Sequence, residues 1–265
     1  MGYNGVSSPL VCLKDARLYV KGGLASQDLF SRVKQVLRYH RIPDIVNRPS
    51  RQLVEALLFC IGSQHTPFER AVAFARSLQS VSESELWKEN YLAQMGSEAG
   101  LLFTDRFGRV LEFVQKYQGG IEGLAEDFLN SPLRVRRELM REKVYLAPKT
   151  ASFWYLCIGG NDLMTLDRHA LRQARGFGLQ IPRVFTRGRL RPAGRYIVDQ
   201  PRIAEYEKLE ARIIDRATSI PELRNGGKAN AALVTVLLWM LGVEDTRSTE
   251  DKPHRLLLEP LYREA

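Results

Sequence analysis

The chain has 265 residues, of which 45% are hydrophobic and 26% charged, and its formal net charge is +9 at pH 7. This composition excludes a wholly disordered chain, and the length corresponds to one large or two modest domains. No apolar run reaches the ~18–20 residues needed to cross a bilayer, and the N-terminal segment lacks the pattern of a signal peptide. We therefore expect an intracellular protein, in the cytoplasm or nucleoid, that does not insert into a membrane.

The first half of the chain is mostly helical in pattern. A short strand is expected at residues 17–20. Apolar residues then recur at spacings of three and four, which predicts amphipathic helices over residues 29–39, 52–61, 68–78, 109–117 and 133–140. Pro49 and Pro67 mark helix starts, whereas Gly119 and Gly120 mark a stop.

The second half continues this pattern. Pro148 suits a first helical position, so a helix is expected over residues 149–158, ended by Gly159 and Gly160. After a short loop, Thr165 or Asp167 is placed to cap a second helix. Further helices are expected over residues 205–217 and 231–241, the last of them strongly apolar and buried.

Three cysteines, Cys12, Cys60 and Cys157, are odd in number and far apart in sequence. This spacing excludes a disulfide scaffold and a four-cysteine zinc or iron–sulfur site. We expect three buried thiols.

The positive charge is concentrated in one stretch. Residues 168–198 contain eight arginines and no aspartate, glutamate or lysine. Arginine favours bidentate contacts to phosphate, so a polyanion such as DNA or RNA is the expected partner, and a solvated basic loop is the alternative. The prolines and glycines there disfavour a long amphipathic helix lying on a membrane.

Lys149 and Asp167 form the most informative pair. They stand 18 residues apart, at the starts of two consecutive expected helices, so one helix and one loop can bring both to one cavity. A lysine amine attacks carbon only when it is neutral, and a helix start disfavours the ammonium form. An amine that attacks a sugar anomeric carbon displaces the base and leaves an imine, while a carboxylate stabilises the positive charge that develops. Spacing alone also fits two ordinary surface residues.

The run PKTASFWYLCIGG followed by LDRHALR resembles the catalytic core of the helix-hairpin-helix DNA glycosylases. It is most similar to the archaeal-type 8-oxoguanine DNA glycosylase/AP lyases. The resemblance covers residues 50–242 and implies an all-α fold of two lobes with the active site between them. One lobe would comprise residues 1–49 and 145–265, and the other, a helical bundle, residues 50–144.

The resemblance also implies roles for individual residues. Lys149 would be the nucleophile and Asp167 its carboxylate partner, with Arg168 and His169 completing the motif and His169 orienting Asp167 or meeting phosphate. Gln64 and His65 would lie where the damaged base has left the duplex, and Phe153 and Trp239 would form the walls of the base pocket. Trp154 is expected in the core. Backbone contacts would come from Arg187, Arg189 and Arg191.

By this resemblance the protein is a monomeric, bifunctional glycosylase and lyase that needs no metal or redox cofactor. Its partner would be double-stranded DNA with a damaged base, 8-oxoguanine in the first instance. The nucleotide would swing out of the stack, Lys149 would attack C1′, and the imine would permit elimination of the 3′ phosphate.

One departure concerns the hairpin, where the family carries Gly-x-Gly just before the lysine and this chain has Tyr145, Leu146 and Ala147. Alanine in a left-handed conformation costs about 1–2 kcal/mol, so we expect either a reshaped hairpin or a weaker phosphate grip.

Three alternatives stay open. The enzyme could excise another lesion, such as an oxidised pyrimidine or mismatched uracil or thymine. It could be an alkylbase glycosylase that uses the aspartate alone, which leaves Lys149 without a role. It could also be a DNA-binding module without catalytic activity.

Overall fold

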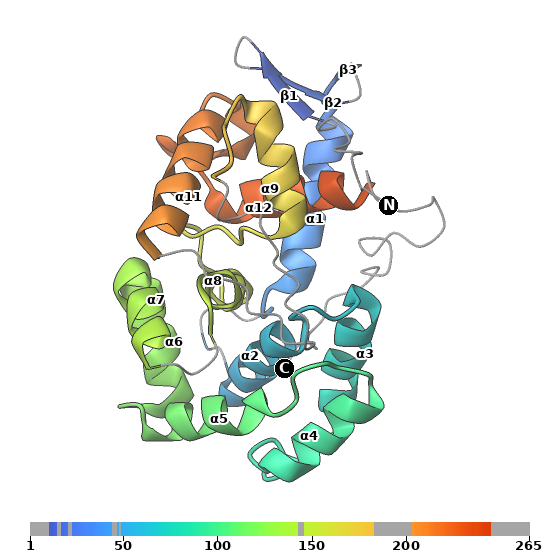
Figure 1. Cartoon of the computed structure of the whole chain (residues 1–265), viewed down its shortest axis with the longest axis vertical. Coiled ribbons are helices and arrows are strands. Elements are labelled where there is room, and N and C mark those ends of the chain that lie inside the picture. Colours follow the sequence, from blue (N-terminus) through green and yellow to red (C-terminus); the bar gives the residue numbers. More distant parts are fainter. Residues whose placement is uncertain are drawn as a thin grey trace, which may run out of the picture. The chain divides into compact units, whose positions relative to one another are not determined.

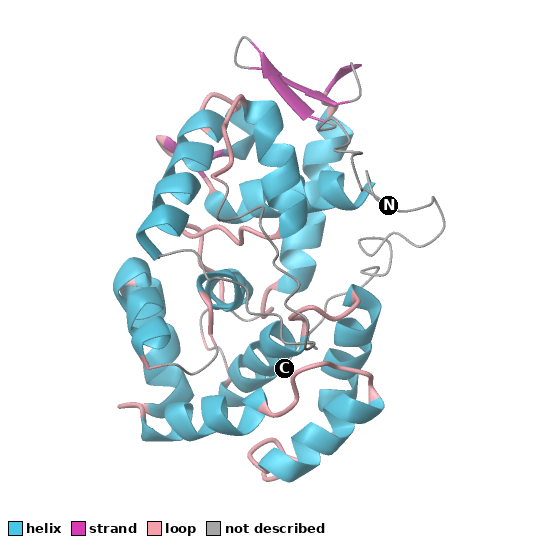
Figure 2. Cartoon of the chain, in the orientation of Figure 1, coloured by secondary structure: helices cyan, strands magenta, loops and turns pink. Residues whose placement is uncertain are grey.

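The computed structural model describes residues 11–14, 17–20, 23–43, 47, 49–142, 146–182 and 203–244. This part of the chain is mostly helical (Figures 1 and 2), which confirms the all-α prediction. Two compact units can be separated, with boundaries inside α1 (Gln27–His40) and at Leu166. The described part contains no helix that is long and apolar enough to span a bilayer.

The larger unit runs from Gln35 to Thr165 and is a helical bundle. Besides the end of α1, it contains α2 (Ser50–Gly62), α3 (Phe68–Leu78), α4 (Glu89–Glu98), α5 (Arg106–Lys116), α6 (Gly120–Asn130), α7 (Pro132–Arg141) and α8 (Pro148–Cys157). Helix α2 lies at its centre and packs against α3, α5, α6 and α8. Every residue of α2 from Gln52 to Gly62 is buried, so this helix forms the core on all of its sides.

Large side chains fill the space between α2 and its neighbours. Trp154 of α8 is fully buried, as predicted, and its indole nitrogen donates to the Leu53 carbonyl oxygen at 3.3 Å. Phe128 of α6 packs against Trp154 and Tyr155 at ring-centroid distances of 5.7 and 5.0 Å. Burying aromatic rings of this size contributes ~1.5–3 kcal/mol each, which fixes α8 in the bundle.

The smaller unit combines the N-terminal segment with the chain from Leu166. Its helical elements are the start of α1, α9 (Arg168–Ala174), η1 (Arg175–Phe177), α11 (Ile203–Ala217), η2 (Pro221–Leu223) and α12 (Ala231–Glu244). Helix α12 packs closely on α9 and also contacts α11. Asn230 caps α12, because its side-chain oxygen accepts from the amides of Ala232 and Leu233 at 3.0 and 3.1 Å.

Two small antiparallel sheets complete this unit. The strand predicted at residues 17–20 is β2 (Arg17–Val20), and it lies between β1 (Val11–Lys14) and β3 (Gly23–Leu24). Residues Val11 and Lys14 pair with Val20 and Arg17, so the register is that of a tight hairpin. Strands β4 (Arg224–Asn225) and β5 (Lys228–Ala229) form a second hairpin directly before α12.

The helix-end signals of the sequence are confirmed. Pro148 is the first residue of α8, and the helix ends before Gly159, whose φ of 101° only glycine adopts readily. Gly119 likewise has a φ of 77° between α5 and α6. The lobe boundaries expected after residues 49 and 144 stay a prediction. In the two compact units described above, α8 belongs to the helical bundle.

Candidate active site

Helix α8 is buried at every position except two. Among its residues Pro148–Cys157, Lys149 and Phe153 alone are half-buried. Residues four positions apart lie on the same face of a helix, so the amine and the aromatic ring share one accessible stripe. An otherwise buried helix therefore presents a nucleophile and an apolar surface side by side.

The described residues just before Lys149 have backbone conformations that do not require glycine. Ala147, the residue that precedes α8, has a φ of −57°, and the side chain of Leu146 is buried. His65 is the one described non-glycine residue with a positive φ, so neither Leu146 nor Ala147 takes the left-handed conformation. Ala147 therefore carries none of the strain of a left-handed conformation. Tyr145 lies outside the described residues.

The Lys149 amine lies close enough to α2 for its charge to act on the Cys60 thiol. In the described part of the chain, Nζ has neither a hydrogen-bond partner nor an ion pair. Burial raises the pKa of Cys60 well above its ordinary value, while the Lys149 charge opposes this rise. Cys60 and Cys157 are both buried thiols, as expected, with 3.8 Å between their sulfur atoms. The side chain of Cys12 lies outside the description.

Gln64 ties the turn after α2 to the beginning of α8. Its Nε2 donates to Oγ1 of Thr150 at 3.0 Å, and its Oε1 accepts from Nη1 of Arg106. Gln64 is buried, at 9% exposure. The residue next to Lys149, Thr150, is thus held by Gln64, a side chain that the family resemblance predicts to lie near the vacated base.

His65 forms the exposed tip of the same turn. Its φ of 56° is left-handed, a conformation that costs about 1–2 kcal/mol for a residue with a Cβ. Its ring contacts Phe103 edge-on at 5.7 Å between centroids, and the Arg106 guanidinium lies 3.8 Å above the same Phe103 ring. The tip therefore combines aromatic surface with positive charge.

Phe153 lies at the edge of an aromatic cluster. Its ring centroid is 5.5 Å from that of Phe59 and 5.8 Å from that of His40, and His40 in turn lies 5.9 Å from Phe68. Burial lowers the pKa of His40 to about 4, so this ring is neutral near pH 7. The cluster gives Phe153 a rigid apolar backing.

In the smaller unit, Asp167 caps α9 as predicted. Its Oδ1 accepts from the Ala170 amide at 2.7 Å, and the residue is half-buried. Its other carboxylate oxygen has no partner in the part of the chain that the structure describes. One oxygen therefore fixes the side chain and the second remains available to a ligand.

His169 follows in the first turn of α9 and faces α12. Its Nδ1 lies 3.0 Å from the Gly242 carbonyl oxygen. The two backbones are so close here that a Cβ on Gly242 would come within 2.6 Å of the His169 Cβ. Burial lowers the pKa of His169 below its ordinary value of 6.5, and the charge of Asp167 works against this.

Helix α12 repeats the arrangement of α8. From Ala231 to Gly242 every residue is buried except Trp239, which is half-buried. Trp239 precedes Gly242 by three residues and so lies on the face of α12 that carries the His169 contact. The smaller unit therefore gathers Trp239, His169 and Asp167 around the junction of α9 and α12.

The described part of the basic stretch begins in α9. Arg168 and Arg175 are exposed, whereas Arg172 is half-buried. Arg187, Arg189 and Arg191 lie outside the described residues. Of the described candidates, Gln64, His65, Lys149 and Phe153 belong to the larger unit, and Asp167, Arg168, His169 and Trp239 belong to the smaller one.

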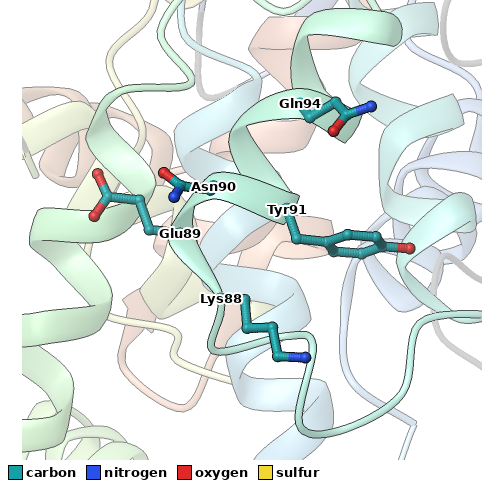
Figure 3. A pocket seen from close by; sticks show the side chains of 5 residues that line it. All are labelled: Lys88, Glu89, Asn90, Tyr91 and Gln94. Carbon is teal, nitrogen blue, oxygen red and sulfur yellow. The ribbon is translucent and has the colours of Figure 1, made fainter.

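An open surface hollow lies elsewhere in the larger unit, at the beginning of α4 (Figure 3). It is lined by Lys88, Glu89, Asn90, Tyr91 and Gln94. None of the candidate residues lines it, and its residues all come from the short segment 88–94. We assign no function to this hollow.

Four residues that contact the candidate side chains were not predicted from the sequence: Thr150, Phe103, Arg106 and Gly242. Thr150 adjoins the candidate lysine, but nothing in its spacing announces a contact with Gln64. Phe103 lies just before α5 and Arg106 is its first residue, and neither belongs to a recognisable motif. Their contacts depend on how α2 packs against α5, which only the folded chain displays.

No protein-family model and no curated protein matches the sequence. Among solved structures, the fold matches the crystal structure of the Methanocaldococcus jannaschii 8-oxoguanine glycosylase/lyase in complex with a 15mer DNA containing 8-oxoguanine. The similarity has a TM-score of 0.55 at 16% sequence identity, and it covers 82% of this chain and 91% of that one. The chain therefore has a fold similar to that of a DNA glycosylase/lyase.

Proposed function

We propose that this protein is a DNA glycosylase with an associated lyase activity, and that 8-oxoguanine is the base it removes. The observation that carries the proposal is the accessible stripe of α8, where an aromatic ring and a half-buried amine without a partner among the described residues interrupt a buried helix. A surface lysine of no function has little reason to occupy that position, because burying part of an amine without a partner costs free energy. The similarity of fold to a glycosylase/lyase supports this interpretation.

The proposed reaction has two stages. The amine of Lys149 attacks C1′ of the damaged nucleotide, the bond from C1′ to the base breaks, and the base leaves with the bonding electrons. Asp167 stabilises the positive charge that develops on the sugar. The nitrogen then loses its proton and forms the C1′=N bond of the imine as the C1′–O4′ bond breaks, with O4′ taking the electron pair and a proton. The imine allows a proton to leave C2′ and the C3′–O bond to break, which cuts the strand on the 3′ side.

Binding is proposed to depend on the His65 tip and the basic residues. The exposed His65 and the Phe103 and Arg106 side chains behind it occupy the space that the extruded nucleotide leaves in the duplex. Phe153 and Trp239 contact the extruded base. Arg168 and the arginines that follow it contact phosphates, largely without regard to sequence.

Borohydride trapping tests the proposal. The purified protein is incubated with duplexes containing 8-oxoguanine, an oxidised pyrimidine or mismatched uracil, and the imine is reduced to a stable crosslink. We expect a crosslink with the 8-oxoguanine duplex, none with the Lys149→Gln variant, and an undiminished one with Lys116→Gln. Lys116 is a matched control because it is an exposed lysine of α5 paired with Glu112.

The other outcomes are equally informative. Trapping on a different lesion alone would replace 8-oxoguanine as the substrate but keep the enzyme class. Tight duplex binding without a crosslink would indicate a DNA-binding module. A crosslink that persists in Lys149→Gln would show that another amine is the nucleophile.

A further inference from the structure

The tautomer of His169 is fixed by its contact with α12. A carbonyl oxygen only accepts, so the 3.0 Å contact between Nδ1 and the Gly242 oxygen places a hydrogen on Nδ1. In the neutral ring the lone pair then resides on Nε2. Nε2 has no hydrogen-bond partner among the residues that the structure describes.

The surroundings of His169 favour this neutral form. Burial is the main cause that lowers its pKa, and the nearby charges of Arg168 and Arg172 act in the same direction. Asp167 and the Gly242 carbonyl oppose them without reversing the result. Near pH 7 the ring therefore offers a proton acceptor at Nε2 and has no second N–H to donate to a phosphate oxygen.

The acceptor lies among the residues already proposed to meet the nucleotide. Asp167 precedes His169 by two residues at the same helix start, and Trp239 lies one turn before Gly242 on the contact face of α12. Nδ1 and Cβ of this half-buried residue face Gly242, so Nε2 is the ring nitrogen that this contact leaves unengaged.

We propose that His169 is the general base of the strand-cleavage step, an inference that rests on the proposed glycosylase/lyase function. Once Lys149 holds C1′ as an imine, Nε2 of His169 removes a proton from C2′. The C2′–H electron pair forms the C1′=C2′ bond of an enamine. The enamine then forms C2′=C3′ as the C3′–O bond breaks, and the 3′ phosphate leaves with that electron pair.

The experiment uses a duplex with a preformed abasic site, so that base release plays no part. Imine formation is measured by borohydride trapping and strand cleavage by denaturing gel, both under single-turnover conditions. His169→Asn keeps an amide N–H where Nδ1 meets Gly242 but lacks the basic nitrogen. His169→Gln places a non-basic amide where Nε2 stands. The control is Lys116→Gln, which changes an exposed residue of α5 that takes no part in the proposed contacts.

We expect both His169 variants to form the imine within threefold of the wild-type rate, while cleavage slows by ~10²–10⁴, the range for losing a general base. The wild-type cleavage rate should fall about tenfold per pH unit below the pKa of His169, and this acid limb should vanish in both variants.

Other results would overturn the proposal. If His169→Gln cleaves normally while His169→Asn does not, the residue acts through hydrogen bonding and not through proton transfer. Cleavage within threefold of wild type in both variants, or equal losses of trapping and cleavage, would also refute it. Failure of the wild-type protein to form any imine would instead refute the proposed function.

Discussion

The Nε2 of Gln64 and the Oγ1 of Thr150 are joined by a hydrogen bond of 3.0 Å, which connects the turn after α2 to the residue next to Lys149. Both side chains are buried, at 9% and 4% exposure. The bond therefore holds the first turn of α8 in one position relative to the His65 tip. The bond thus helps to fix the backbone from which the Lys149 side chain extends.

Removing the Thr150 hydroxyl should loosen this connection. Thr150→Val keeps the shape of the side chain but leaves the buried amide of Gln64 without this acceptor, so the free energy of unfolding should fall by about 1–3 kcal/mol. Chemical denaturation measures the change. Thr150→Ser, which keeps the hydroxyl, is the control and should recover most of the hydrogen-bond contribution. Equal stabilities of the valine and wild-type proteins would show that the bond contributes nothing.

Asp167 has two separable roles, because one oxygen caps α9 and the other has no partner among the described residues. Asparagine is as good a helix cap as aspartate, so Asp167→Asn should change the melting temperature little. The same change removes the negative charge that we propose stabilises the positive charge developing on the sugar, so we expect base release to slow by ~10²–10⁴. Single-turnover release of 8-oxoguanine measures this rate. A loss of less than threefold would exclude an electrostatic role.

His40 predicts a specific dependence of stability on pH. The folded protein holds this histidine neutral, with a pKa of about 4 compared with the ordinary 6.5 of an unfolded chain. The unfolded state therefore binds a proton first as pH falls, so stability present above pH ~6.5 is lost progressively down to pH ~4. The shift corresponds to about 3 kcal/mol.

The measurement is the free energy of unfolding from pH 7 to pH 4 for the wild type and His40→Gln. As the pH falls over this range, the wild type should lose about 3 kcal/mol more of its free energy of unfolding than His40→Gln does, because the two proteins share all other titrating groups. His65→Gln changes an exposed histidine and should reproduce the wild-type slope. Parallel curves for the wild type and His40→Gln would contradict the buried neutral ring.

The arginine-rich stretch after α9 should control how binding responds to salt. Each phosphate contact contributes about 0.9 to the slope of log K against log salt, so neutralising Arg187, Arg189 and Arg191 should flatten the slope by up to ~3. Fluorescence anisotropy with an undamaged duplex at several salt concentrations measures it. Changing Lys208, Arg212 and Arg216 of α11 to glutamine removes an equal charge from another segment. Identical slopes in the wild type and the first variant would remove residues 187–191 from the interface.

Much of the helical framework could be predicted from the sequence because amphipathic spacing determines which face is buried. Helix α3 lies at the predicted residues, and α2, α5, α7, α8 and α11 agree within a few residues at their ends. Helix α6 was not predicted, because Gly119 and Gly120 were interpreted only as the end of the preceding helix. They do end α5, but the chain turns at Gly119 and at once begins a helix whose buried residues are Ile121, Leu124, Ala125 and Phe128.

The remaining misses have physical causes as well. Helix α4 buries only Leu92 and Gly96, so its apolar pattern is too sparse to recognise. The strands β1, β3, β4 and β5 contain four residues or fewer, and they exist through pairing with a partner strand rather than through their own propensity. For the site, the spacing of Lys149 and Asp167 together with the family resemblance singled out this pair, and their catalytic roles stay a prediction. The contacts of Gln64 with Thr150 and of His169 with Gly242 arise from packing between segments distant in sequence.

The contact between Gly242 and His169 restricts how this part of the chain could change during evolution. Because α9 and α12 approach so closely there, any side chain at position 242 would clash with His169. One residue inserted between Trp239 and Gly242 would turn the indole by about 100° around the helix. Homologues that use this tryptophan should therefore keep the interval free of insertions and deletions, even where the neighbouring apolar residues are freely exchanged.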